Sequence, residues 1–469
     1  MSMHTGDPAT WTVEALSREI YEQRLSPVDV VESYLARIAR LDGTMHAFID
    51  LHADEARLAA QAADKAIRAG YYLGPLHGVP IALKDLIEIE GKVVTGGSAA
   101  WSDRIATRTA TLVTRLVQAG AIILGKTHTV EFAFGGWGTN QHFGTPLNPW
   151  DLNHPRTPGG SSSGSAVAIA TGMAPCAMGT DTGGSVRMPA AWCGLTGLKT
   201  SLGRISGYGV LPLSSTLDTP GPMAYTVNDV ALLYRLLCGP DPLDRRTWGL
   251  PAHDRGQMGA ASSSLKGMRL LRMPQAERAY ASAEMLAAYD RSVDELERLG
   301  AEIHCIDLPC AFADVAKLNG LIMSAESYSL LGKLVTDSDL PLDDHVRPRV
   351  MAGRGVLAQD YIDALSERQL LIAKFDDALQ GYDALLTPTM TTTALLLEEV
   401  DQTTAPSHFT RFGNFLDLCA LSLPNGQDQQ GLPTSLQIVG RQYQETTVLK
   451  IGQAYQEATQ WHHRRPLGL

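Results

Sequence analysis

Three segments of the chain contain residue types that could carry out acyl transfer. They read GVPIALKD at 78–85, GGSSSGS at 159–165 and GTDTGGSVRMPA at 179–190. A serine hydroxyl becomes a nucleophile when a base removes its proton. A lysine can be that base if burial lowers its pKa from about 10.4 toward about 7–8. Each segment alone is also compatible with an ordinary turn, a serine-rich loop or an exposed Lys–Asp pair.

The third segment predicts a loop that binds an oxyanion. We expect a strand to end near Gly179 and a helix to begin near Val186, which places Ser185 at the junction. Backbone N–H groups that converge at such a junction can stabilise the oxygen of a tetrahedral intermediate. These groups belong to Thr182, Gly183, Gly184 and Ser185.

The order and spacing of the three segments resemble the amidase signature family. Ser185 lies 24 residues after Ser161, and Lys84 lies 77 residues before Ser161. The likeness extends over about residues 25–460, because segments at 194–199, 218–223 and 431–437 also resemble the family.

This resemblance implies a hydrolase of amide bonds with a Ser–cisSer–Lys triad. Because the sequence contains neither a metal-ligand cluster nor a nucleotide site, we expect no metal or organic cofactor. Ser185 would be the nucleophile that forms an acyl-enzyme, and Lys84 would be the base. Ser161 would bridge the two and would follow a cis peptide bond, while Ser162 and Asp181 would support the site. Related members also cut anilides, esters and carbamates, because all of these substrates pass through a similar oxyanion.

The elements that must position these segments alternate between helix and strand. The apolar periodicity predicts helices at 27–40, 53–69, 109–119, 165–171, 186–192 and 285–299, and strands at 79–83, 121–124, 302–306 and 384–388. Such alternation predicts an α/β fold in which a mixed, twisted sheet has helices on both faces.

One large α/β/α domain is expected to span residues 1–469. Its parts would be N-terminal helices at 8–70, a core at about 70–240 and 380–460, and a peripheral helical region at 241–380 that starts with a surface excursion at 241–266. The chain shows no internal repeat and no clean linker that would divide it.

Composition excludes several classes of function. The 469 residues carry a net charge of −11, which argues against nucleic acid or an anionic membrane as the main partner. The six cysteines have no zinc-ligand spacing and are typical of a reducing compartment. No apolar run approaches the ~18 residues that span a bilayer, and residues 1–10 lack the profile of a signal peptide. We therefore expect a cytoplasmic protein.

Two patterns suggest other enzymes. Residues 120–127 match the P-loop GxxxxGK[ST], but the apolar strand lies inside the pattern instead of before it. Residues 160–164 match the GxSxG elbow, which would make Ser162 the nucleophile, but NHPRTP at 153–158 is not the strand that this elbow requires. There is no HExxH motif for a zinc hydrolase.

The substrate pocket is less well defined. Phe134 and Trp137 are candidates for an apolar wall or for ordinary core packing. Arg187 could bind a substrate carboxylate or satisfy buried carbonyl groups. The alternative function within the resembled family is a glutaminase-type subunit of a tRNA-dependent amidotransferase. Those subunits bind the glutamine ammonium with an aspartate before a glutamate, and the position that we align with it is Gln444. This difference favours a free-standing enzyme with a small amide substrate, and a homodimer is compatible with either function.

Overall fold

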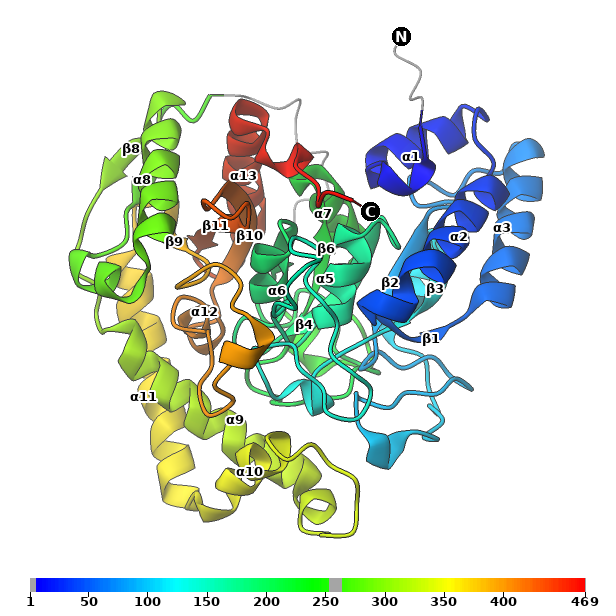
Figure 1. The fold of residues 1–469 in the computed structure, drawn as a ribbon. Helices are drawn as coiled ribbons and strands as arrows, with labels where there is room; N and C mark the ends of the chain where they lie inside the picture. The colour runs from blue at the N-terminus through cyan, green and yellow to red at the C-terminus, as the bar shows by residue number, and fades with distance from the viewer. Residues whose placement is uncertain (1–5, 253–263, 469) are drawn as a thin grey trace.

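A computed structural model describes residues 6–252 and 264–468, and one mixed sheet of eleven strands runs through them (Figure 1). The strand order is β1-β3-β2-β4-β6-β5-β10-β11-β9-β7-β8. The strands are β1 Phe48–Leu51, β2 Pro80–Lys84, β3 Ile122–Thr127, β4 Cys176–Asp181, β5 Thr196–Lys199, β6 Thr219–Ala224, β7 Arg269–Leu271, β8 Glu302–His304, β9 Ala384–Pro388, β10 Cys419–Gln427 and β11 Pro433–Gly440. The predicted α/β fold with a mixed sheet is confirmed.

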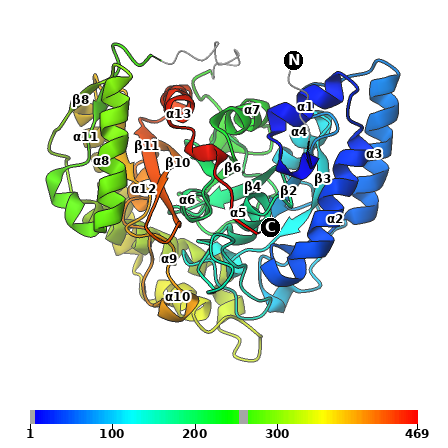
Figure 2. The ribbon, with the colours of Figure 1, turned by 45° about the horizontal axis from the view of Figure 1, so that its top comes forward.

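The helices pack along the whole length of this sheet (Figures 1 and 2). They are α1 Val13–Tyr21, α2 Pro27–Met45, α3 Ala53–Arg68, α4 Thr111–Gln118, α5 Ser163–Ala170, α6 Arg187–Trp192, α7 Val227–Leu237, α8 Ala283–Arg298, α9 Phe312–Val335, α10 Val346–Met351, α11 Ala358–Ala378, α12 Arg411–Phe415 and α13 Glu445–Thr459. In both views α1, α2 and α3 lie beside β1–β3, whereas α8 and α11 lie at the opposite end of the sheet.

Two parallel strands bring the first and third chemical segments to the same edge of the sheet. Strand β2 pairs parallel with β4, and Leu83 lies opposite Met178 in the register. The carboxyl ends of parallel strands meet at one edge, where α/β enzymes bind their ligands. Lys84 at the end of β2 therefore lies near Asp181 at the end of β4.

Helix α5 carries the second segment to that edge. All eight of its residues are buried and most are small, which lets the helix lie close to its neighbours. A Cβ added at Gly164 would lie 2.3 Å from the carbonyl oxygen of Ala47, so only glycine fits this contact. The serines that precede α5 thus face the ends of β2 and β4.

Each predicted helix and strand is observed, with ends that differ by up to five residues. The strand expected at 302–306 ends at His304, because only three residues pair with β7. Five strands were not predicted, although β6 lies in the centre of the sheet; they are β1, β5, β6, β7 and β10. The surface excursion expected at 241–266 falls partly on residues 253–263, which lie outside the described residues.

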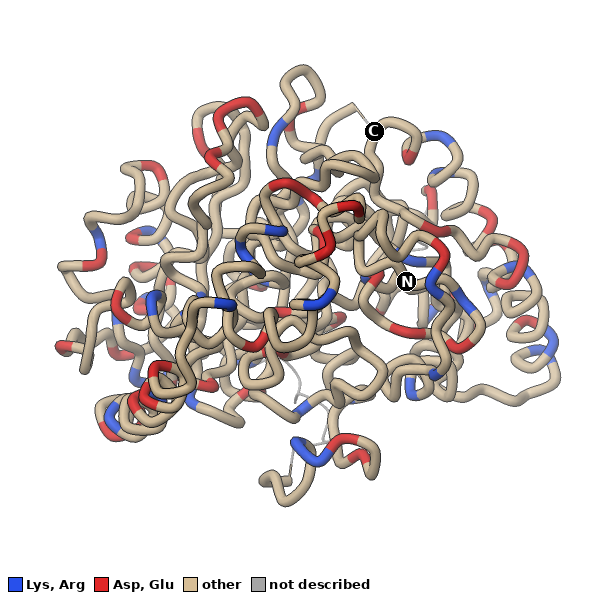
Figure 3. The backbone as a smooth tube through the Cα atoms, turned by 90° about the horizontal axis from the view of Figure 1, so that it is seen from below, with Lys and Arg blue, Asp and Glu red and all other residues tan. Residues whose placement is uncertain are grey.

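Helices that are far from the three motifs in sequence pack near the edge of the sheet at which these motifs meet. Helix α9 contacts α10, α11 and α12, and in Figure 1 α9, α10 and α11 form the lower left of the molecule. Lysine, arginine, aspartate and glutamate are interspersed along the outer elements in the view from below (Figure 3). Among the described residues, no helix combines the length and the apolar character that crossing a membrane requires.

Candidate active site

Lys84 lies at the centre of the site and has no exposed surface. Its Nζ donates hydrogen bonds to Ser161 Oγ at 2.7 Å and to Thr180 Oγ1 at 2.8 Å. Burial lowers the pKa of Lys84 to about 7, although Asp218 and Asp181 act in the opposite direction. No carboxylate in the described part of the chain forms an ion pair with it within 4 Å, so the amine can exist uncharged near neutral pH and accept a proton.

The pKa of Lys84 predicts how activity depends on pH. Below about pH 7 the amine already carries a proton and cannot accept one, so kcat/KM should fall about tenfold for each further pH unit. Above that pH the rate should reach a plateau. The measurement is kcat/KM from pH 5 to 9 with an amide whose acylation limits the rate, and a flat profile would contradict a lysine base.

Ser161 is held between Lys84 and the rest of the second segment. The Gly160–Ser161 peptide bond is cis, and Ser161 is fully buried. The N–H of Gly160 donates to the carbonyl oxygen of Gly136 at 2.8 Å, and the carbonyl oxygen of Ser161 accepts from the N–H of Val130 at 3.2 Å. These backbone contacts fix the position from which Ser161 Oγ accepts the hydrogen bond of Lys84.

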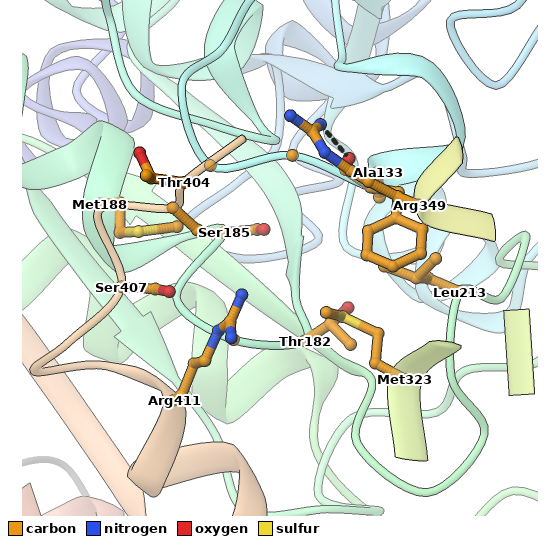
Figure 4. Close-up of a pocket in the computed structure, with 15 residues that line it drawn as sticks. Ala133, Thr182, Ser185, Met188, Leu213, Met323, Arg349, Thr404, Ser407 and Arg411 are labelled. Atoms are coloured by element: carbon orange, nitrogen blue, oxygen red, sulfur yellow. Dashed lines mark hydrogen bonds between the residues drawn. The ribbon is translucent and has the colours of Figure 1, made fainter. Parts of the chain in front are cut away.

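Ser185 lies between β4 and α6 and lines a cavity of about 460 Å³ that opens to solvent (Figure 4). Its carbonyl oxygen accepts a hydrogen bond from the N–H of Ser162 at 3.2 Å, which joins the second and third segments directly. Among the described residues its hydroxyl has no hydrogen-bond partner. It is therefore available to attack a molecule in the cavity.

The loop before Ser185 differs from the expected oxyanion loop in one amide. The N–H of Gly184 donates to Asp181 Oδ1 at 2.7 Å, so it points into the protein and not into the cavity. In the part of the chain that the structure describes, the N–H groups of Thr182, Gly183 and Ser185 have no acceptor, and all three residues line the cavity. The structure thus leaves three of the four predicted amides free.

Gly184 is nevertheless required for the shape of this loop. Its φ is +127°, a conformation that favours glycine. A Cβ at this position would lie 2.4 Å from Thr410 Oγ1, which itself donates to the carbonyl oxygen of Gly183 at 2.6 Å. This contact anchors the loop to the residue that precedes α12.

Arg187 supports the loop from behind instead of lining the pocket, which corrects the expectation that it binds substrate. It has no exposed surface, and its Nη2 lies 2.9 Å from Asp181 Oδ1. Its Nη1 donates to Gln437 Oε1 at 2.8 Å and its Nη2 to Asn414 Oδ1 at 2.7 Å. Burial alone would raise the pKa of Asp181, but the Arg187 guanidinium holds it well below its usual range. The buried pair supports the loop that contains Ser185.

The two aromatic candidates differ in their position. Phe134 lines the cavity, whereas Trp137 does not. The Trp137 ring stacks on Trp192 with centroids 5.7 Å apart, and its Nε1 donates to the carbonyl oxygen of Thr404 at 3.0 Å. Trp137 is thus part of the core behind the pocket.

Gln444 is exposed at the start of α13 and does not line the cavity. The residue type at position 444 therefore does not indicate whether the cavity could bind a glutamine ammonium group.

Sequence reasoning missed several residues around the site. Thr180 accepts a hydrogen bond from the Lys84 amine, as Ser161 does, and it lies in the third motif at 179–190. Asp218 accepts from Thr182 Oγ1 at 2.5 Å, and burial raises its pKa to about 6. Arg349 and Arg411 line the cavity from α10 and α12. No local motif marks either arginine.

The fold thus places a buried lysine against a serine that follows a cis peptide bond, beside a cavity that Ser185 lines. The model of the Amidase family matches residues 29–449, and the chain belongs to this family. It is an amidase-family hydrolase that acts on amide bonds.

Several known proteins resemble the chain over nearly its whole length. A glutamyl-tRNA(Gln) amidotransferase subunit from Geobacter metallireducens is 35% identical over 97% of this chain and 98% of the relative. The structure of native peptide amidase from Stenotrophomonas maltophilia superposes with a TM-score of 0.85 at 30% identity, covering 97% of this chain and 98% of that one. An inhibitor-bound structure described as a vestigial complex that reveals the origins of an s-triazine catabolic enzyme has a TM-score of 0.89 at 29% identity, with 98% and 100% covered.

Proposed function

We propose that this chain is a free-standing amidase that forms an acyl-enzyme on Ser185. The observation that carries the proposal is the 2.7 Å hydrogen bond between the buried Lys84 amine and Ser161, next to a free Ser185 hydroxyl in the cavity. In this proposal Lys84 is the base, Ser161 is the bridging hydroxyl and Ser185 is the nucleophile. Amide hydrolysis by a serine requires these three functions.

The first half of the reaction acylates the enzyme. Ser185 Oγ attacks the amide carbon, its proton passes to Ser161, and the proton of Ser161 passes to Lys84. The relay closes when the Ser185 hydroxyl turns toward Ser161, a contact that in many enzymes forms only with substrate bound. The free N–H groups of Thr182, Gly183 and Ser185 stabilise the oxyanion.

The second half of the reaction returns the protein to its starting state. When the tetrahedral intermediate collapses, the proton on Lys84 returns through Ser161 to the leaving nitrogen, and an amine departs. Water then attacks the acyl-enzyme and gives its proton to the same relay. The ester bond to Ser185 breaks, and the relay returns that proton to Ser185 Oγ. The products are a carboxylic acid and an amine or ammonia.

A second candidate function is the glutaminase-type subunit of a tRNA-dependent amidotransferase. The observation that favours it is the 35% identity to a protein of the glutamyl-tRNA(Gln) amidotransferase. The cavity argues against it, because its described lining residues include two arginines and no carboxylate. A free glutamine would bring an ammonium group that has no acceptor of opposite charge there.

A panel of amides tests the two functions on the purified chain alone. It includes glutamine and glutaramate, which is glutamine without its ammonium group. A free-standing amidase should turn over amides with no partner protein and should prefer glutaramate to glutamine. Activity on glutamine and on no other amide of the panel would contradict the proposal. Activity that appears only when a partner protein is added would also contradict it.

Removal of metal ions should leave the activity unchanged. In the proposed mechanism Ser185 is the nucleophile, Lys84 is the base and backbone amides stabilise the oxyanion. A metal ion and its bound hydroxide provide the nucleophile and the oxyanion stabilisation in metal-dependent hydrolases. The measurement is kcat before and after exhaustive dialysis against a chelator. Loss of turnover that a divalent cation restores would show that the relay is not sufficient.

A further inference from the structure

Two arginines face the cavity that contains Ser185, and neither is paired with a carboxylate. Arg349 comes from α10 and Arg411 from α12 (Figure 4). No aspartate or glutamate in residues 6–252 and 264–468 forms an ion pair with either guanidinium within 4 Å. The negative charge of Asp343 acts on Arg349 and favours its charged form. The carboxylate oxygens of Asp343, however, accept hydrogen bonds from the backbone N–H groups of Gln141 and His345.

Arg349 is held in place by neutral acceptors. Its Nη1 donates to the carbonyl oxygen of Phe134 at 2.7 Å. Its Nη2 donates to the carbonyl oxygen of Gln402 at 2.5 Å and to the side-chain oxygen of the same residue at 3.1 Å. These bonds fix the orientation of the guanidinium, but none of the acceptors carries a charge that would neutralise it.

Arg411 makes fewer hydrogen bonds than Arg349. Within the described structure its one hydrogen bond runs from Nη1 to the carbonyl oxygen of Ala316 at a long 3.4 Å. The side chain crosses the oxyanion loop, since a Cβ at Gly183 would lie 3.3 Å from Arg411 Cγ. Figure 4 shows its guanidinium pointing into the cavity toward Ser185. Burial and the positive charge of Arg349 both lower the pKa of Arg411.

Two neighbouring guanidinium groups without a counter-ion are costly to bury, and a bound anion would remove that cost. Arginine binds carboxylates through two parallel hydrogen bonds, which the free donors of Arg411 allow. Four large apolar side chains also line the cavity and suit a short aliphatic chain. They are Phe134, Met188, Leu213 and Met323.

We propose that Arg349 and Arg411 form an anion subsite, and that the substrate is a short amide that carries a carboxylate. This inference rests on the proposed function of Ser185. The carboxylate binds the two arginines, the aliphatic part contacts the apolar walls, and the amide carbon lies at Ser185. The monoamides of short dicarboxylic acids have this chemistry.

The test compares substrates that differ in charge and not in shape. Succinamate is paired with 4-methylpentanamide, in which two methyl groups replace the carboxylate oxygens, and malonamate and glutaramate extend the series in length. We expect a higher kcat/KM for at least one anionic amide than for its neutral counterpart. Arg411→Met and Arg349→Met should each lower that ratio by about 10- to 100-fold, the usual effect of hydrogen bonds to a charged group.

Arg354→Met is the matched control, because it removes an exposed arginine near α10 that does not line the cavity. It should leave the ratio of the two rates unchanged. Thermal unfolding of all variants separates binding from structure, since a structural arginine would lower stability and both rates together. Neutral amides preferred at every length, or equal losses on both substrates, would overturn the anion subsite.

A neutral fluorophosphonate separates this inference from the function on which it rests. If the reagent fails to label Ser185, the proposed nucleophile is wrong and the subsite falls with it. If Ser185 is labelled and anionic amides still have no advantage, only the anion subsite is wrong.

Discussion

Replacing Ser185 with alanine is expected to lower kcat by about 10⁴- to 10⁶-fold, the range over which removal of a serine nucleophile acts in comparable hydrolases. The hydroxyl of Ser185 is the group that forms the bond to the substrate carbon, and no other hydroxyl of the proposed triad lines the cavity. The residual rate would come from the oxyanion donors and from substrate binding. Both contributions survive the substitution, because Ser185→Ala retains the backbone N–H.

A fluorophosphonate label and the Ser162→Ala variant complete this experiment. Peptide mass spectrometry should find the label on Ser185 in the wild type and nowhere in Ser185→Ala. Ser162 is fully buried, and its Oγ contacts the backbone of Thr180, so Ser162→Ala should still be labelled. Labelling that disappears in Ser162→Ala but persists in Ser185→Ala would instead identify the GxSxG serine as the nucleophile.

Replacing Lys84 with methionine should damage amide hydrolysis more than ester hydrolysis. The amine must leave with a proton, which in the proposed relay comes from Lys84 through Ser161. A phenolate leaves without this help. Both substrates lose base catalysis in Lys84→Met, but the amide also loses its proton donor, and a general acid is typically worth about 10²–10⁴-fold. Methionine fills the volume of the fully buried side chain, which limits loss of stability.

The measurement compares kcat/KM for an amide and an aryl ester of the same acid, in wild type and Lys84→Met. Acylation must be shown to limit both reactions in each protein. Thr180→Val is a useful companion, because Thr180 contacts the same amine without taking part in the relay, and it should affect amide and ester about equally. Equal losses in Lys84→Met would show that the lysine acts as base or scaffold only.

Site residues could be predicted from the sequence where they lie in short continuous motifs. Lys84, Ser161 and Ser185 each lie beside glycines or at the end of an apolar strand. Their order and spacing resemble the amidase signature family, and this resemblance predicted that the three segments meet. Strand β6 was missed because Pro220 and Pro222 argue against a central strand, since proline cannot donate to the ladder.

The contents of the pocket could not be predicted for a different reason. Arg349 and Arg411 come from elements that no motif connects to Ser185, and only the packing of α9, α10 and α12 brings them together. Arg187 shows the converse case. It lies two residues from Ser185 in the chain, yet the first turn of α6 directs its side chain into the core toward Asp181. Proximity in sequence does not determine the side of a loop on which a side chain lies.

Residues 410–414, at the start of and within helix α12, combine two different tasks in one helical turn. Some of them hold the loop that contains Ser185, and another lines the cavity. Thr410 anchors the Gly183 carbonyl, and Asn414 Nδ2 donates to the carbonyl oxygen of Asp181 at 2.9 Å, so both hold the loop that positions the nucleophile. Arg411, between them, lines the cavity that contains Ser185. A lineage that kept the two anchors could therefore exchange position 411 and acquire substrates of different charge without rebuilding its catalytic loop. Libraries randomised at position 411 should yield altered selectivity far more often than libraries randomised at 410 or 414, which should mainly yield inactive protein.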